Sequence, residues 1–349
     1  MKSWFRFCCI GVALLAGFGC GKKADEGGAG VGKPPAGQMR TQPGGQNVVL
    51  NGKTLKITVM DIGQGDSTLI ETPSGKTVLI DAGLPGSQDK IEPILREHHV
   101  SKLDFIVDSH PHNDHIGGMG KLLEEVPFDT VYDSALVTNA PAQTRLLKAI
   151  KAGGGKFVRA RKGMTVPIDN DVTMEILQPQ DPLFQEGDKN YINNDSVIVR
   201  FVFGKTRLLF TGDMEEVERA RLYESGADIR ADFLKIAHHG SRNGTDAEFL
   251  GRVKPQIATI SCATGNSFGH PHAEAIQALQ ATQIALYRTD LSGTIVINCD
   301  AEGHLQALPS QIAESNRVYQ PGDDRQEQKR RRRKRYVERI FANVCEVGV

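Results

Sequence analysis

The stretch SHPHNDHIGGM, at residues 109–119, concentrates side chains that bind metal ions. Three histidines and one aspartate fall within six positions of it: His110, His112, Asp114 and His115. Imidazole and carboxylate groups are common protein ligands of zinc and other transition metals. Four such groups in one short segment predict a metal site.

The neighbouring sequence places this cluster on a loop between a strand and a helix. Residues 103–107 are apolar and strand-like, and Gly117 and Gly118 follow the cluster. Binding residues often lie on loops that rigid elements hold in place. The first two histidines can point to one side, while the aspartate and the third histidine turn to another. The segment can therefore hold two metal ions close together.

The composition is that of a soluble globular protein with a substantial core. The chain has 349 residues, of which 39% are hydrophobic and 24% are charged. Lys plus Arg and Asp plus Glu both total 42, so the chain has no global charge bias. Any affinity for nucleic acid must come from a local patch.

The N-terminal residues resemble an export signal. Residues 1–20 carry early positive charge, an apolar run at 8–18 and then Cys20, as in a bacterial lipoprotein signal. An uncleaved anchor and an ordinary secretory signal stay open. Residues 21–47 are rich in Gly, Pro, Lys and Gln and predict a flexible linker. We expect an exported lipoprotein, anchored in a membrane through Cys20 and facing the periplasm or the extracellular side.

The C-terminal residues 316–349 form a polar and basic tail with seven consecutive cations, KRRRRKR, at 329–335. This block fits a contact with nucleic acid or anionic lipid, or simply a solvated tail. Cys262 and Cys299 each lie in an apolar run and are expected to be buried thiols, although they could pair if adjacent strands bring them together.

Strands dominate the region 48–315, which is expected to be one folded domain, and helices lie between them. Strands are expected at residues 55–61, 67–71, 77–81, 103–107, 172–177, 196–203, 207–211, 231–236, 256–261, 284–287 and 293–298. Helices are expected at 88–98, 118–125, 142–152, 215–225 and 273–281, and after Thr245. This α+β pattern suits two sheets that face each other with helices outside.

Four further motifs also place polar side chains at or near the end of an expected strand. They are DIGQGDS at 61–67, DAG at 81–83, TGD at 211–213 and KIAHHGS at 235–241. Carboxylates and imidazoles that recur at strand ends can assemble a metal site from distant parts of a chain.

The ordered set of these motifs, with HPHNDH and FGHPH (268–272), resembles the metallo-β-lactamase superfamily. More narrowly, it resembles the hydrolase domain of ComEC-type competence proteins over roughly residues 54–300. The resemblance implies a four-layer αβ/βα sandwich that holds two divalent metal ions, Zn or Mn, along one sheet edge.

The resemblance also implies roles for individual residues. It assigns His110 and His112 to the first metal ion, Asp114 and His115 to the second, and Asp213 to a bridge between the two. One histidine of the pair His238 and His239, with a preference for His239, completes the second set. Asp81 orients a ligand imidazole through its other nitrogen, or alternatively caps its loop. Asp114 and His270 are the candidate catalytic residues, His270 as a phosphate contact or proton donor, and Ser241 contacts substrate.

One departure from the family pattern concerns the first metal ion. Many family members carry a histidine between HxHxDH and the bridging aspartate, but none occurs from 116 to 237 here. Asn194 or Asp195, in the motif NNDS at 193–196, could replace it, or the position could be open. An oxygen ligand would favour manganese, and a site with a single ion also stays open.

Two ions ~3.5–4 Å apart lower the pKa of a water molecule and polarise the substrate oxygen. The leading hypothesis is an exported metal-dependent phosphodiesterase or nuclease that acts on DNA or another phosphodiester. A cell-envelope esterase of the choline-phosphate type is one alternative. A non-catalytic lipoprotein that binds DNA or a partner is another.

Overall fold

The computed structural model describes residues 48–311. The expected signal segment with Cys20, the linker at 21–47 and the tail at 316–349 lie outside the described residues. Within 48–311, no helix has the length and apolar character that crossing a bilayer requires.

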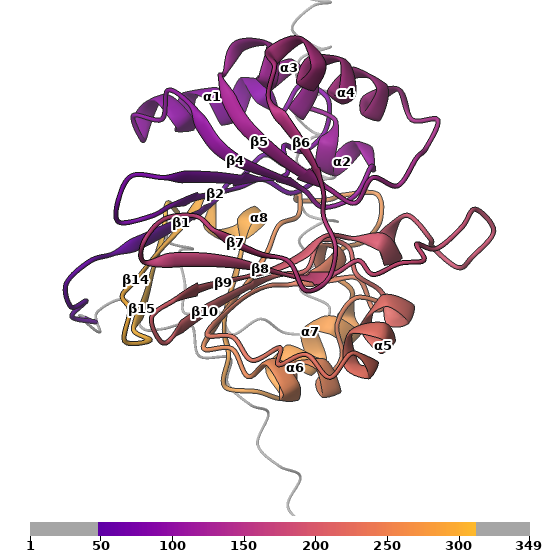
Figure 1. Cartoon of the computed structure of the whole chain (residues 1–349). Helices are drawn as coiled ribbons and strands as arrows, with labels where there is room; N and C mark the ends of the chain where they lie inside the picture. The colour runs from indigo at the N-terminus through magenta and orange to yellow at the C-terminus, as the bar shows by residue number, and fades with distance from the viewer. Residues whose placement is uncertain (1–47, 312–349) are drawn as a thin grey trace, which may run out of the picture. The chain divides into compact units, whose positions relative to one another are not determined.

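The first of two β-sheets has eight strands in the order β15-β14-β1-β2-β3-β4-β5-β6 (Figure 1). Their bounds in that order are Leu305–Pro309, Ile295–Cys299, Leu55–Val59, Thr68–Glu71, Thr77–Ile80, Leu103–Asp108, Phe128–Asp133 and Lys156–Arg159. Strands β3 to β6 are parallel to one another, and the remaining pairs are antiparallel.

The second sheet has seven strands in the order β13-β12-β11-β10-β9-β8-β7. Their bounds in that order are Ala285–Arg288, Ile257–Ile260, Phe233–Lys235, Thr206–Phe210, Ile198–Phe203, Val172–Gln178 and Thr165–Pro167. Strands β10 to β13 are parallel, so the motifs that follow β10 and β11 leave the sheet at the same edge.

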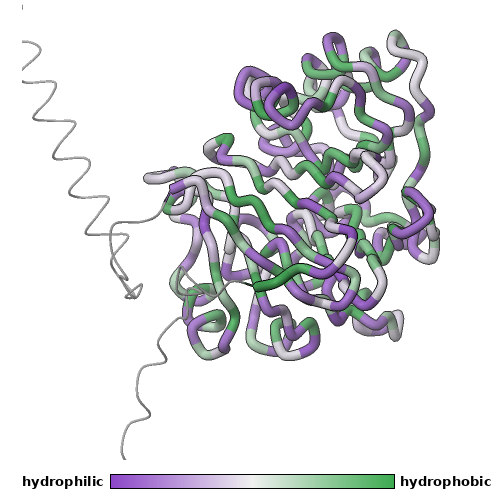
Figure 2. Tube along the Cα trace, turned by 90° about the vertical axis from the view of Figure 1, so that its left-hand side faces the viewer, coloured by the Kyte–Doolittle hydropathy of each residue, from purple (hydrophilic) through white to green (hydrophobic). Residues whose placement is uncertain are grey.

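Strand alternation builds the core between the two sheets. In β10, Leu208 and Phe210 face the cluster that joins the sheets, while Leu209 faces the helices on the other side. Successive strand residues point to opposite faces, so a buried strand must be apolar on both. Figure 2 shows hydrophobic (green) and hydrophilic (purple) stretches alternating along the trace.

Helices cover the outer face of each sheet, which confirms the expected αβ/βα sandwich. Beside the first sheet lie α1 (Gln88–Glu97), α3 (Met119–Glu125) and α4 (Pro141–Gly153). Beside the second lie α5 (Glu216–Glu224), α6 (Ala247–Val253) and α7 (Ala273–Gln280) (Figure 1). Two short helices, α2 (Asn113–Ile116) and α8 (Thr289–Ser292), complete the set.

Four strands were not expected from the sequence: β5, β6, β7 and β15. They are short or interrupted by polar residues, and β6, β7 and β15 are edge strands. Strand β6, for example, has no fully buried residue. Their extended conformation comes from pairing with a neighbour, which a local pattern does not reveal. Cys262 and Cys299 are buried free thiols, as expected.

Candidate metal centre

The segment after β4 is held by the aspartate that ends β3. Asp81 Oδ1 accepts a hydrogen bond from Ser109 N at 2.8 Å, and its Oδ2 accepts one from Ser109 Oγ at 2.7 Å. The same Oδ2 lies 2.8 Å from His115 Nδ1. Asp81 thus ties the histidine segment to the first sheet and leaves Nε2 of His115 for another partner.

The helix α2 separates the four clustered candidate ligands into two before it and two inside it. His110 and His112 precede the helix, with His112 in extended backbone as its N-cap, whereas Asp114 and His115 lie inside it. His110 Nε2 is 3.0 Å from His112 Nδ1, so their ring nitrogens meet at one point. The expected division of the four residues between two metal ions stays a prediction.

Asp213, from the second sheet, reaches into the middle of the histidines. Its Oδ1 is 3.2 Å from His115 Nε2. Its Oδ2 is 3.6 Å from His110 Nε2 and 3.8 Å from His239 Nε2. The two carboxylate oxygens therefore face different imidazoles, which is the arrangement that a bridging ligand requires.

Gly212 permits this approach of the two sheets. Its φ is +49°, and a Cβ atom there would lie 2.9 Å from both Ser109 Cβ and Ser196 Oγ. Only glycine adopts this conformation without strain and leaves space for these neighbours. Ser196 Oγ also accepts a hydrogen bond from Asp213 N at 3.1 Å. The NNDS motif therefore contacts the centre through its serine.

The structure distinguishes the two histidines that follow β11. His239 is buried, and its Nε2 is 3.2 Å from Asp114 Oδ2 while its Nδ1 donates to Ser261 O at 3.0 Å. His238 is partly exposed, with Nε2 3.7 Å from Asp213 Oδ2 and Nδ1 2.9 Å from Glu215 Oε1. Both have positive φ, 48° and 52°, and such strain is common at functional sites.

These positions predict different metal contents when each of the two histidines is replaced by alanine. His239→Ala should reduce the metal content by one ion per chain, because it removes a nitrogen that faces Asp114. His238→Ala should retain the ion beside Asp114. Elemental analysis after dialysis against Zn²⁺ or Mn²⁺ measures both values, and the reverse pattern would assign the ligand role to His238.

The donor atoms fit divalent metal ions. Asp213 Oδ1 and His115 Nε2 are buried, and although they lie 3.2 Å apart, neither makes a hydrogen bond to the other or to another group. Ligand atoms within 4.8 Å of one another form four overlapping groups: His110–His115–Asp213, Asp114–His115–His239, Asp66–Asp81–His115 and Asp66–Asp213–His239. Buried polar atoms without partners are costly, and a cation between them would remove that cost.

The charges of the centre are strongly coupled. Burial alone would raise the pKa of Asp213, but the charges of the neighbouring histidines, first His115, lower it well below the ordinary value. Burial would lower the pKa of His239, but Asp213 and Asp66 raise it to about 10. In contrast, burial lowers the pKa of His110. Asp213 is thus ionised, as a metal-binding carboxylate must be, and a bound cation would displace the proton from the His239 imidazole.

Asp66, in the DIGQGDS motif, is a site residue that the sequence analysis did not single out. Its Oδ2 forms a 2.8 Å ion pair with Lys235 Nζ, and both side chains are buried. Its Oδ1 lies 3.4 Å from His239 Nδ1. Burial favours a raised pKa for Asp66, but the charge of Lys235 lowers it far below the ordinary value. The position of Asp66 within a glycine-rich motif was the available signal.

Asn194 and Asp195 lie beside the centre, but their side-chain oxygens accept hydrogen bonds from backbone N–H groups outside it. Asn194 Oδ1 accepts from the backbone N–H groups of Glu215 and Glu218 at the start of α5, at 3.3 and 3.1 Å. Asp195 Oδ2 accepts from Phe184 N at 2.8 Å. Asp195 belongs to none of the groups of converging His, Cys, Asp and Glu atoms among the described residues. Both side chains hold neighbouring backbone in place, and their expected role at the first metal ion stays a prediction.

The buried Asp195 should make stability depend on pH. Burial raises the pKa of Asp195 from 3.8 to about 7. A carboxyl group whose pKa is higher in the folded than in the unfolded protein stabilises the fold while it is protonated. Its contribution to the unfolding free energy is complete below pH 4 and is lost as the pH rises to about 7. The slope for one group is ~1.4 kcal/mol per pH unit. Asp195→Asn should flatten this dependence of the unfolding free energy.

Urea denaturation at pH 5, 6 and 7 measures that slope for both proteins. Asp129→Asn, at an exposed ion pair with Lys102, is the matched control and should keep the wild-type slope. Buried Glu218, whose pKa burial also raises, adds a slope of the same sign that remains in the variant. An unchanged slope in Asp195→Asn would contradict the assignment.

His270 lies next to the histidine pair. Its ring centroid is 5.2 Å from that of His238 and 6.0 Å from that of His239, and its Nδ1 is buried without a hydrogen-bond partner. Burial and the neighbouring histidines lower the pKa of His270 to about 3. Both expected roles of His270, phosphate contact and proton donor, stay predictions.

The other two polar residues of this region hold the loops in place. His272 precedes α7, and its Nδ1 accepts from Arg242 N at 3.1 Å. Ser241 N donates to His238 O at 2.7 Å, and Ser241 Oγ accepts from Asn243 N at 3.4 Å. Ser241 is buried, so its hydrogen bonds stabilise the turn that carries the histidine pair.

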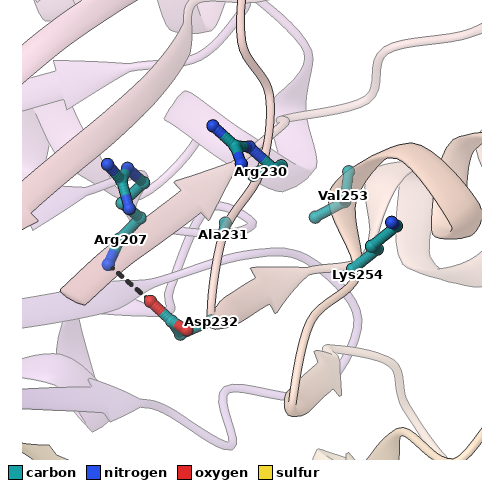
Figure 3. Close-up of a pocket in the computed structure, with 6 residues that line it drawn as sticks. All are labelled: Arg207, Arg230, Ala231, Asp232, Val253 and Lys254. Atoms are coloured by element: carbon teal, nitrogen blue, oxygen red, sulfur yellow. Dashed lines mark hydrogen bonds between the residues drawn. The ribbon is translucent and has the colours of Figure 1, made fainter. Parts of the chain in front are cut away.

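A separate cavity of about 210 Å³ lies where β10 and β11 begin (Figure 3). The TGD and KIAHHGS motifs lie at the opposite ends of these strands. Its lining residues are Arg207, Arg230, Ala231, Asp232, Val253 and Lys254. Arg207 N donates to Asp232 Oδ2 at 2.9 Å, shown as a dashed line in Figure 3. None of the described metal-centre residues lines it, so it is not the substrate pocket of that centre.

The fold and the site together define a class of protein: two facing sheets with a histidine and aspartate metal centre at one edge. The family model of the metallo-beta-lactamase superfamily matches residues 60–264. The chain belongs to this superfamily of hydrolases, whose fold binds divalent metal ions.

Relatives with competence names match most of the chain. ComE operon protein 3 of Bacillus subtilis is 29% identical over 257 residues, which cover 69% of this chain and 32% of that protein. Competence protein ComA of Neisseria gonorrhoeae is 30% identical over 243 residues, which cover 68% and 31%. These matches confirm the resemblance to ComEC-type proteins, and the chain spans about a third of the length of each.

A shorter match concerns a protein named as a nuclease. Exodeoxyribonuclease WalJ of Streptococcus pneumoniae is 30% identical over 134 residues, which cover 37% of this chain and 48% of that protein.

Proposed function

We propose that this protein is a metal-dependent phosphodiesterase or nuclease that acts on DNA or another phosphodiester. The observation that carries the proposal is the position of Asp213, whose two oxygens face separate imidazoles at 3.2 and 3.6 Å. The names of the relatives, competence proteins and an exodeoxyribonuclease, support DNA as the substrate.

The side chains divide into two ligand sets around Asp213. His110 and His112 would hold one ion, Asp114, His115 and His239 would hold the other, and Asp213 would contact both. When bound, divalent ions supply a water of lowered pKa and polarise the phosphoryl oxygen. This chemistry suits a phosphodiester, because charge increases on its oxygens in the transition state.

Other side chains near the centre orient the candidate ligands or the substrate. Asp81 accepts from Nδ1 of His115 and directs its Nε2 toward Asp213. Ser261 O and Asp66 hold Nδ1 of His239 in the same way. A buried imidazole that is fixed through one nitrogen presents the other in a single orientation. His270, beside the histidine pair, would donate a hydrogen bond to a substrate phosphate.

The proposal includes export and anchoring in a membrane through lipidated Cys20. Its support is the charged, apolar and cysteine-containing order of residues 1–20. The linker at 21–47 would then separate the metallo-beta-lactamase domain from the membrane surface.

One experiment tests the activity. The full chain, after dialysis with Zn²⁺ or Mn²⁺, is analysed for metal content and assayed with bis-p-nitrophenyl phosphate, plasmid DNA and p-nitrophenyl phosphorylcholine. Two ions per chain with turnover of the first two substrates are expected. Exclusive turnover of the choline ester would replace the proposal with an envelope esterase. DNA binding without any turnover, unchanged by Asp114→Ala, would replace it with a binding module.

A further inference from the structure

Phe268, in the FGHPH motif, is the most exposed phenylalanine in the described part of the chain. Its exposure is 61%, compared with 39% for Phe157 on the edge strand β6. A phenylalanine that stays mostly exposed gains little from burial in the fold. A ring in such a position is available to an external partner.

This ring lies at the end of a row of rings that begins in the metal centre. The Phe268 centroid is 5.6 Å from the His270 centroid, and the two planes differ by only 19°. The His270 ring lies in turn 5.2 Å from that of His238 and 6.0 Å from that of His239. Phe268 is therefore one ring away from the candidate ligands.

The loop that carries Phe268 is held in one conformation. Asn266 Nδ2 donates to Ala263 O at 3.0 Å and to His270 O at 2.6 Å. Its Oδ1 accepts from His270 N at 3.0 Å. The loop is also tied to the DIGQGDS motif, because Ala263 N donates to Gln64 Oε1 at 3.2 Å. A fixed ring loses little conformational freedom when a ligand binds.

We propose that Phe268 is a stacking platform for an unpaired nucleobase next to the phosphodiester that the metal centre cleaves. This inference rests on the proposed function and names its substrate class, a single strand or a frayed end. His270 covers one face of the phenyl ring, and a planar base can occupy the other in offset stacking. A paired base inside a duplex has both faces stacked and cannot bind in this way.

The arrangement favours a base over a quaternary ammonium group. Cages for such cations surround one point with several aromatic faces. The described residues place one ring, that of His270, against Phe268. Base stacking, in contrast, needs a single planar face and tolerates any base sequence.

Equilibrium binding tests the platform without turnover. The metal-loaded full chain is titrated into labelled oligothymidylate and into an abasic oligomer of equal length, both with phosphorothioate linkages that resist hydrolysis. Phe268→Leu should weaken thymidylate binding on the order of tenfold and leave abasic binding unchanged, because stacking of one base contributes roughly five- to 150-fold. Phe268→Tyr should keep the wild-type affinity.

Phe157→Leu is the matched control, since it removes the other exposed phenylalanine, and it should change neither affinity. Hydrolysis of ordinary phosphodiester oligomers should show the same pattern in KM. Equal loss with both oligomers, or no loss with either, would overturn the platform. Absence of turnover with every phosphodiester would instead overturn the proposed function, while the binding data would still decide the role of Phe268.

Discussion

Asp213→Ala is expected to remove both metal ions and to lower kcat/KM for phosphodiesters by about 10³-fold or more. The reason is that the oxygens of Asp213 face both sets of imidazoles, at 3.2 Å on one side and 3.6 Å on the other. Metal ions contribute several kcal/mol of transition-state stabilisation, and each 1.36 kcal/mol corresponds to about a tenfold change in rate. Elemental analysis and steady-state kinetics with bis-p-nitrophenyl phosphate measure the two effects.

Asp129→Ala is the control for this prediction. Asp129 forms an exposed 2.6 Å ion pair with Lys102 at the surface of the first sheet. Its loss should leave metal content and kinetics unchanged, since exposed pairs contribute little. Circular dichroism establishes that both variants are folded. Two ions retained in Asp213→Ala would exclude the bridging role.

Lys235→Met is expected to destabilise the fold by about 3–5 kcal/mol, because it leaves the buried Asp66 charge without its partner. The pair connects the DIGQGDS motif before β2 to the last residue of β11, so it joins the loops of the two sheets. Asp66 also faces His239. Activity should therefore decrease even in conditions where the variant remains folded.

Two further variants separate stability from positioning. Lys205→Met removes a 2.6 Å ion pair with Glu302 that is exposed, and it should cost less than about 1 kcal/mol. The double variant Asp66→Asn, Lys235→Met contains no buried unpaired charge, so it should regain most of the stability. Its activity should stay low, because the charged contact to His239 is gone. Urea denaturation and kinetics give both values, and full activity in the double variant would refute the positioning role of Asp66.

The sequence was sufficient to predict the layers and most strands, because apolar residues recur with a clear period along these segments. It was insufficient for β5, β6, β7 and β15. In β5, for instance, the polar residues Asp129 and Thr130 interrupt the pattern. Its strand conformation comes from the register with β4, where Asp108 pairs with Asp133. That partner is known only once the chain has folded.

At the metal centre, the sequence alone determined which chemical groups are present. Imidazoles and carboxylates at strand ends, and glycines beside them, are local properties that a chain carries whatever its fold. The motifs therefore indicated the superfamily and the candidate metal-binding residues.

Only the tertiary structure decided which of these groups face one another. It turned His239 toward Asp114 and His238 toward Glu215, although the two are adjacent in the chain. It directed Asn194 to the start of α5 and brought Asp66 to Lys235. These outcomes depend on distances between loops of two different sheets. Such distances are fixed by the packing of the core, which no single segment of the sequence encodes.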